Sequence, residues 1–204
     1  MDLCKVIHEV VNKLERYRIP FHEHTLPING ICIVFDRSEK VHGHDRIVGI
    51  INQSSQTGFR LRLRADFLGK NKNRSTLRKN IGLAILGKKQ DQYVKDWNDP
   101  RQSPGNNSDT MIKKRKTEKQ VSQYIKNNIS FSIIELGDSV LRKKATNEIA
   151  SVLAMCPDCR QSDTWLGSHS TNRKVVNSGL WLGGVSNKKI SNQYNSLKTL
   201  LKYM

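Results

Sequence analysis

The chain has 204 residues and carries 35 Lys and Arg against 18 Asp and Glu, which gives a formal net charge of +17. This length fits one domain, and a sequence pI of about 10.0 indicates a polyanionic partner such as nucleic acid. No apolar run approaches the ~20 residues of a membrane-spanning helix, and the N-terminus lacks the apolar segment of a signal peptide. Four scattered cysteines do not make a secreted disulfide framework, so we expect a cytoplasmic protein with reduced thiols and no membrane partner.

The first part of the chain predicts one helix and two strands. Apolar residues recur at helical spacing over residues 2–17, which predicts an amphipathic helix. Pro20 and Pro27 keep the next segment extended. The β-branched runs 31–35 and 47–51 predict two strands, joined by the long polar loop between them.

Residues 59–68 fit two patterns. Phe59, Leu61 and Leu63 alternate with arginines as they would in a strand. Phe59, Leu63 and Phe67 recur every four residues as they would in a helix. Periodicity alone leaves both alternatives open.

The second part of the chain predicts helices, one strand and a basic insertion. Ser75 can cap a helix that Gly87 ends. Over 98–119 Pro, Gly, Asn, Ser and a run of Lys and Arg replace apolar residues, so we expect a flexible basic insertion whose cations are solvated or bind phosphate. The remaining predicted elements are a helix at 118–127, a strand at 129–136 and a helix at 139–154 that Asp138 or Ser139 caps.

This order of elements predicts an α+β fold, in which helices flank a small, mostly antiparallel sheet. Residues 1–27 are expected to form an N-terminal helix and an extended lead-in. Residues 28–184 are expected to form the domain, and 185–204 a C-terminal tail or helix.

Short sequences in the two predicted strands resemble the signatures of the GIY-YIG nuclease superfamily. Gly30-Ile31-Cys32 is similar to the first signature, with Cys32 where the family has a tyrosine. Ile47-Val48-Gly49 is similar to the second, with Ile47 at the tyrosine position. The chain therefore resembles this family at the glycines and departs from it at both tyrosines.

Motifs further along resemble the same family. In Arg62-Leu63-Arg64-Ala65-Asp66-Phe67, Arg62 matches the family's helix arginine and Asp66 stands where a histidine or tyrosine is common. Motifs similar to those of a group of uncharacterised members are Asp45-Arg46-Ile47-Val48, Asn73-Arg74-Ser75, Arg78-Lys79-Asn80-Ile81-Gly82, Trp165-Leu166-Gly167 and Ser178-Gly179-Leu180-Trp181. The resemblance extends over residues 28–184.

The resemblance implies a GIY-YIG-like fold and an endonuclease that cleaves DNA phosphodiester bonds with one divalent metal, Mg²⁺ or Mn²⁺. In the family a glutamate on the late helix holds the metal, a strand tyrosine helps to activate water, and the helix arginine holds the phosphate. The catalytic residues that the resemblance implies here are Arg62, Cys32, Gly30, Gly49 and Asp66.

The metal ligand is the weakest part of this resemblance. The family's glutamate position falls on Thr146, which cannot supply a negative charge. Glu148 lies about 200° further around the helix, and Glu135 lies near the end of the preceding strand, so these two carboxylates are the candidate metal ligands. The alternative is a catalytically inactive nucleic-acid-binding module of the same fold, and a ribosome-associated or RNA-binding protein is a third interpretation that rests on charge alone.

Basic residues beside these motifs are the candidates for contact with nucleic acid, which we expect to be double-stranded DNA. They are Arg60, Arg64, Arg74, Arg78 and Lys79. The alternative is a solvated helix surface. Contact with phosphates predicts an affinity that falls steeply as salt rises, because each neutralised phosphate releases counterions.

Cys156-Pro157-Asp158-Cys159 has the spacing of half a zinc site, but the sequence shows no second C-x-x-C motif and no histidine pair nearby. Histidines from 22 to 44 complete such a site only through long-range folding. We therefore interpret these cysteines as structural thiols at a helix end. Trp165 and Trp181 are interpreted as packing residues.

Overall fold

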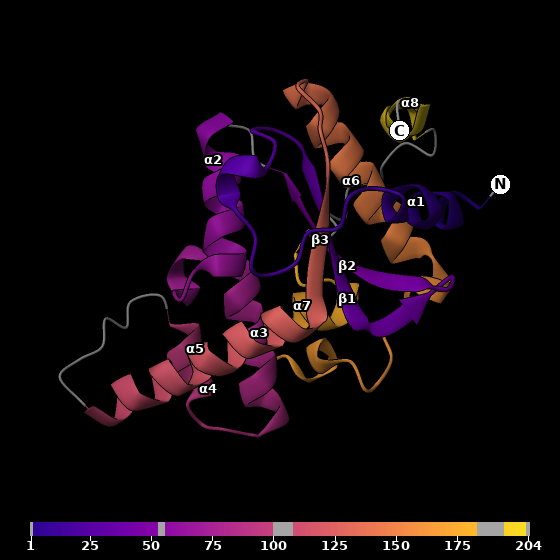
Figure 1. Ribbon diagram of the computed structural model, residues 1–204. Helices are drawn as coiled ribbons and strands as arrows, with labels where there is room; N and C mark the ends of the chain where they lie inside the picture. Colours follow the sequence, from indigo (N-terminus) through magenta and orange to yellow (C-terminus); the bar gives the residue numbers. More distant parts are fainter. Residues whose placement is uncertain (1, 53–55, 100–107, 183–193, 203–204) are drawn as a thin grey trace.

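The computed structural model describes residues 2–52, 56–99, 108–182 and 194–202, with a three-stranded antiparallel sheet at its centre (Figure 1). The strands are β1 (Ile31–Val41), β2 (His44–Asn52) and β3 (Ile129–Ile134), in the order β2-β1-β3. Ile31 of β1 pairs with Asn52 of β2 and with Ile134 of β3. The predicted α+β fold with a small antiparallel sheet is confirmed. In the described ranges no helix is both long and apolar enough to cross a membrane.

β1 and β2 are longer than the sequence predicted, and they meet in a tight turn at His42 and Gly43. The φ angles of these two residues are 51° and 81°, as a two-residue hairpin turn requires. The polar stretch that was expected to form a long loop is therefore mostly strand. Asp36 is buried in it, because Tyr124 Oη and Trp165 Nε1 donate hydrogen bonds to its carboxylate.

Three helices cover one face of the sheet: α2 (Gln56–Leu63), α3 (Thr76–Lys88) and α5 (Ser108–Asn128). Cys32 and Val34 of β1 share a core with Phe59, Ile81 and Val121 from these helices. The short helix α4 (Val94–Asn98) packs against α3, where the Trp97 ring fills the space beside Gly82. We call this side of the sheet the α3 face.

The opposite side carries α1 (Leu3–Asn12), α6 (Ser139–Met155) and α8 (Asn195–Lys202). Ile31, Ile33 and Phe35 of β1 form a second core there with Ile7 and Ile149. Figure 1 shows these three helices on one side of the sheet and α2, α3 and α5 on the other. We call this second side the α6 face.

The two N-terminal caps were predicted correctly from the sequence, whereas the prediction that Gly87 ends its helix is wrong, because α3 continues to Lys88. Ser75 Oγ accepts a hydrogen bond from the Arg78 backbone N–H at the start of α3. Asp138 accepts two backbone hydrogen bonds at the start of α6. Of the two alternatives for 59–68 the helical one is correct, because α2 continues into a π-helical turn over Arg64–Leu68.

The expected insertion at 98–119 is wrong over its second half, because α5 begins at Ser108. Residues 100–107 lie outside the described residues. The basic run forms a helix because Thr117 and Glu118 are buried on its inner side and Glu118 pairs with Arg78. The cations therefore lie on the outer side of a packed helix.

The rest of the chain forms short elements that the sequence did not predict. Helix α7 (Arg173–Ser178) ends at Gly179, whose φ of 66° suits a helix C-terminus. Single 3-10 turns span Glu23–Thr25, Lys72–Arg74, Pro157–Cys159 and Leu166–His169. Of the predicted C-terminal tail or helix, residues 195–202 form α8, whereas 185–193 and 203–204 lie outside the described residues.

Candidate functional site

A pocket of about 320 Å³ opens where the end of β2 meets α2, α3 and the segment 172–182. Its polar lining consists of two cations, Arg62 and Lys174, together with amides and hydroxyls from Asn52, Asn80, Asn172, Thr76 and Ser178. We call it the Arg62 pocket. It presents positive charge and hydrogen-bonding groups, which is the composition that suits an anionic ligand.

Arg62 reaches the pocket from the last turn of α2. Its Nε donates a hydrogen bond of 2.6 Å to Asp66 Oδ2, and its side chain is 30% exposed while that of Asp66 is fully buried. Among the described residues none forms a hydrogen bond with the Nη atoms of Arg62. The ion pair therefore orients the guanidinium and leaves its outer edge free for a ligand.

Asp66 is held in place from two sides. The π-helical turn carries it back toward α3, where Ser75 Oγ donates to its Oδ1. Burial raises the pKa of Asp66, although Arg62 and Ser75 oppose this shift. Because both carboxylate oxygens already have partners, Asp66 acts here as a positioning group for Arg62.

The two positions that align with the signature tyrosines lie on opposite faces of the sheet. Cys32 is fully buried in the core of the α3 face. Ile47 is buried in the core of the α6 face. Burial, reinforced by the charge of Asp66, raises the pKa of Cys32 well above its usual range, so its thiol stays protonated at neutral pH. Neither side chain can activate a water molecule.

The signature glycines have steric roles. A Cβ on Gly30 would lie 2.6 Å from the carbonyl oxygen of Ile134, so a side chain there would clash with β3. A Cβ on Gly49 would lie 3.2 Å from Leu182 Cβ. Both glycines therefore permit close approach of neighbouring backbone.

The motifs near the C-terminus converge on the edge of β2. The Trp181 backbone N–H donates to Val48 O at 2.6 Å. Arg46 donates to Gly179 O at 2.8 Å, pairs with Glu39, and lies over the Trp165 ring. This network fixes the segment that forms one wall of the Arg62 pocket.

A chain of amides joins this wall to α3. Asn80 Nδ2 donates to Trp181 O at 2.7 Å, and Asn172 Nδ2 donates to Asn80 Oδ1 at 3.0 Å. The sequence placed Asn80 in a motif, but nothing in it singled out Asn52, Asn172 or Lys174. These residues become visible as a group only when the chain brings them to one pocket.

The comparisons with known proteins identify the family. A family model described as "GIY-YIG domain" matches residues 2–203. The chain belongs to the GIY-YIG family. No curated protein and no solved structure matches it.

Membership gives the chain a nuclease-type fold, and nucleic acid is the substrate class that this fold suggests. The region that matches the GIY-YIG model includes α1 and α8, which the sequence had placed outside the 28–184 domain. Both helices pack on the α6 face as part of the same core.

The basic residues expected to contact nucleic acid have different surroundings. Arg74 is exposed and Lys79 is half-buried. Arg60 donates to the carbonyl of Leu26, and the exposed Arg64 pairs with Glu23.

Arg78 does not fit the prediction that it contacts nucleic acid. Its side chain is fully buried, and its guanidinium bonds to Glu118 at 2.9 Å and to Ser122 at 2.7 Å. A buried and paired guanidinium cannot reach a phosphate in solution. Arg78 therefore joins α3 to α5, and we do not include it in the nucleic-acid interface.

GIY-YIG nucleases generally use a divalent metal, and the two carboxylates predicted to bind it here are Glu148 and Glu135. Glu148 is buried on the α6 face, where its Oε2 accepts a hydrogen bond from the Leu197 N–H of α8 at 2.7 Å. Glu135 is exposed beyond the end of β3. Neither residue lines the Arg62 pocket.

The Arg62 pocket does not fit Mg²⁺ or Mn²⁺. The described residues that line it include no carboxylate, and the undescribed ranges contain no Asp or Glu. These cations are bound mainly through carboxylate and other oxygen ligands, and carboxylates supply the charge that holds them. Two cationic side chains in the same pocket would repel a metal ion further.

Proposed function

We propose that this GIY-YIG chain binds nucleic acid through the Arg62 pocket and has lost the family's metal-dependent cleavage. The observation that supports this proposal is the lining of the pocket: Arg62, which the buried Asp66 orients, lies there with Lys174 and three amides, and none of the described lining residues is a carboxylate. Double-stranded DNA as the partner and a cytoplasmic location stay predictions from the sequence.

The chemistry of the pocket favours a phosphodiester. A guanidinium offers a planar pair of donors that matches two phosphate oxygens, and a lysine adds charge without fixed geometry. The amide side chain of Asn52 lines the pocket and adds a neutral donor and acceptor that suit a sugar or a base. The net charge of +17 adds long-range attraction to any nucleic acid.

The second candidate is an active endonuclease, which family membership favours. Arg62 would then hold the scissile phosphate, as the family arginine does. The candidate requires a carboxylate close to Arg62, and Asp66 is the one that the structure places there, already paired on both oxygens.

Binding and cleavage should be measured on one preparation. We expect fluorescence anisotropy to show salt-sensitive binding of a labelled DNA duplex, and Arg62→Ala to weaken it by about tenfold or more, since a charge-assisted hydrogen bond contributes about 1.5–3 kcal/mol. Arg62→Lys should restore part of the affinity. Arg18→Ala is the control, because Arg18 is exposed and does not line the pocket.

Supercoiled plasmid incubated with Mg²⁺ or Mn²⁺ separates the two candidates. No nicking by the folded protein, together with Arg62-dependent binding, is the expected result. Nicking that Arg62→Ala abolishes would establish the endonuclease instead. Binding that is insensitive to both salt and Arg62→Ala would overturn the pocket as the site of contact.

A further inference from the structure

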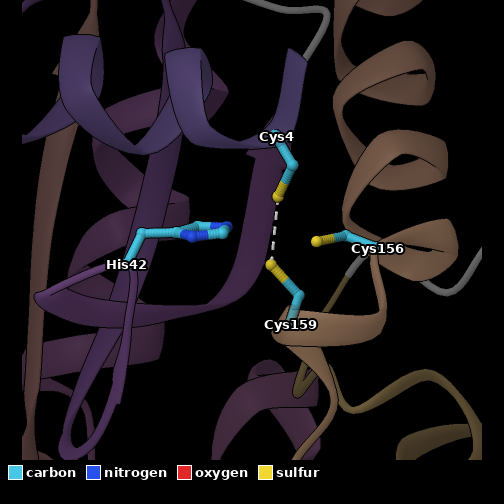
Figure 2. Close-up of side chains that lie close together, drawn as sticks. All are labelled: Cys4, His42, Cys156 and Cys159. Atoms are coloured by element: carbon cyan, nitrogen blue, oxygen red, sulfur yellow. Dashed lines mark hydrogen bonds between the residues drawn. The ribbon is translucent and has the colours of Figure 1, made fainter. Parts of the chain in front are cut away.

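Three cysteines and a histidine from distant parts of the chain converge at the edge of the α6 face. The ligand atoms of Cys4, His42, Cys156 and Cys159 all lie within 4.8 Å of one another. Figure 2 shows the three thiols and the imidazole directed at a common point. Cys4 comes from the first turn of α1, and His42 from the β1–β2 turn. The other two cysteines come from the end of α6 and the 3-10 turn after it.

The separation of the sulfur atoms fits neither a disulfide nor unrelated thiols. Cys4 Sγ lies 3.1 Å from Cys159 Sγ, well beyond the bonded S–S distance of about 2.05 Å. Tetrahedral zinc with Zn–S bonds of about 2.3 Å holds pairs of sulfurs about 3.8 Å apart. The Cys4 and Cys159 sulfurs would have to move apart by about 0.7 Å to bind such an ion, and all four ligand atoms already lie within 4.8 Å of one another.

His42 is placed as a metal ligand of this kind. Its Nε2 is buried and has no hydrogen-bond partner among the described residues. Its Nδ1 lies 3.9 Å from Asp158 Oδ2, so a proton on Nδ1 can face the carboxylate. Metal-binding histidines use this arrangement, because the carboxylate holds the tautomer that presents the other nitrogen to the ion.

A second histidine supports the thiols from outside the cluster. His8 is fully buried on α1, and its Nε2 lies 3.4 Å from Cys159 Sγ. An N–H at this position would stabilise a thiolate, as outer hydrogen bonds do in metal sites. If Cys159 binds a metal, the role of the buried His8 imidazole is to donate a hydrogen bond to the metal-bound sulfur.

We propose that Cys4, His42, Cys156 and Cys159 form a closed zinc site that fastens α1 and the hairpin turn to the end of α6. Three sulfur ligands and one imidazole favour Zn²⁺ over Mg²⁺ or Mn²⁺, which prefer oxygen. Binding releases the three thiol protons as three Zn–S bonds and one Zn–N bond form. Four protein ligands leave no open position, so the role is structural.

The zinc site and the proposed function stand on different observations. Cys4 and Cys159 belong to the core of the α6 face, and neither lines the Arg62 pocket, where Ile51, Val175 and Trp181 belong to the core of the α3 face. Loss of DNA binding would leave the zinc proposal intact, and absence of zinc would leave the pocket intact.

Metal analysis of the full chain tests the proposal. We expect protein purified under reducing conditions to contain a single zinc ion per chain. Titration of the metal-free protein with Co²⁺ should give the thiolate-to-metal charge-transfer band and the strong visible bands of tetrahedral cobalt, at one equivalent. This spectrum reports the ligands directly, without any variant.

Two variants and two controls identify the ligands. Cys156→Ser changes the most accessible of the three thiols, and His42→Asn removes the imidazole while keeping a residue that tolerates positive φ. Each should lower zinc content at least severalfold and change the cobalt spectrum. Cys32→Ala and His24→Asn should retain full zinc, because neither residue belongs to the cluster.

Two results would overturn the proposal. One is folded wild-type protein that binds neither zinc nor cobalt and has four titratable thiols. The other is a Cys4–Cys159 disulfide that persists through purification under reducing conditions, with no metal bound. Variants that do not fold leave the wild-type cobalt titration as the deciding measurement.

Discussion

The two faces of the sheet bring polar groups together for different purposes. On the α3 face a buried carboxylate, Asp66, turns Arg62 outward to a pocket lined by further donors. On the α6 face the thiols of Cys4 and Cys159 and the imidazole of His42 turn toward one another. Side chains that bind a partner must keep donors or acceptors accessible to it, whereas side chains that stabilise the fold direct their polar atoms toward one another inside the protein. The comparison therefore separates a binding site from a structural one by geometry alone.

Removal of zinc should have the largest effect, and it should be concentrated on the α6 face. An ion present at 1,000 times its Kd stabilises the folded state by about 4 kcal/mol. We expect a zinc chelator to lower the unfolding free energy by about that much in urea titrations. Hydrogen exchange should then accelerate more in α1 and the end of α6 than in α3. Equal acceleration on both faces would mean that zinc does not stabilise the α6 face in particular.

Asp66→Asn tests the α3 face in the same way. The variant removes a charged partner from Arg62 and places an amide N–H₂ or oxygen between two donors, Arg62 Nε and Ser75 Oγ. We expect a loss of about 1.5–3 kcal/mol in unfolding free energy and weaker DNA binding, with zinc content unchanged. A double-mutant cycle with Arg62→Ala should show that the two losses are not additive. Additive losses would mean that Asp66 does not orient Arg62.

Lys174→Ala should affect binding without affecting stability. Lys174 lines the pocket, so its removal should weaken DNA binding by roughly tenfold and lower the salt slope by about 1. Lys143→Ala is the matched control, because this exposed lysine lies on α6. Equal effects of the two variants would indicate general attraction by charge in place of a defined pocket.

The smallest effect concerns pH. Burial raises the pKa of Asp66 above its ordinary value of 3.8, so the folded state holds this proton more tightly than the unfolded chain. Stability therefore falls as the pH rises from 3.8 through the folded-state pKa. We expect the difference between Asp66→Asn and the wild type to shift in the variant's favour over that interval, as measured by urea unfolding at several pH values. A shift in the opposite direction would mean that Arg62 outweighs burial.

The length of β1 was predicted wrongly from the sequence pattern. The stretch from Asp36 to Val41 is polar enough to predict a loop, yet it continues β1. Asp36 is buried with donors from Tyr124 and Trp165, which lie far away in the sequence. A charged residue predicts exposure only when no distant partner satisfies it, and the sequence does not show such partners.

At the signature positions the sequence predicted the glycines but not the side of the sheet that each neighbouring residue faces. The glycines were found from their motif, and their steric roles follow from close contacts with Ile134 and Leu182. The pairing register of β1 with β2 shifts by one residue between Val34 and Phe35, and Cys32 and Ile47 lie on opposite faces of the sheet. One-residue irregularities of this kind reverse which side a residue faces, and they leave no clear mark in the sequence.

Features that depend on composition or on neighbouring residues could be predicted from the amino-acid sequence: the positive charge, the caps at Ser75 and Asp138, and the family motifs around Gly30 and Arg62. Which distant side chains come into contact is known only from the folded chain. Cys4 and Cys159 are 155 positions apart and touch, and the amides of the Arg62 pocket come from β2, α3 and the start of α7. The physical reason is that a cap forms within one helical turn, whereas a site forms where the folded chain returns to itself.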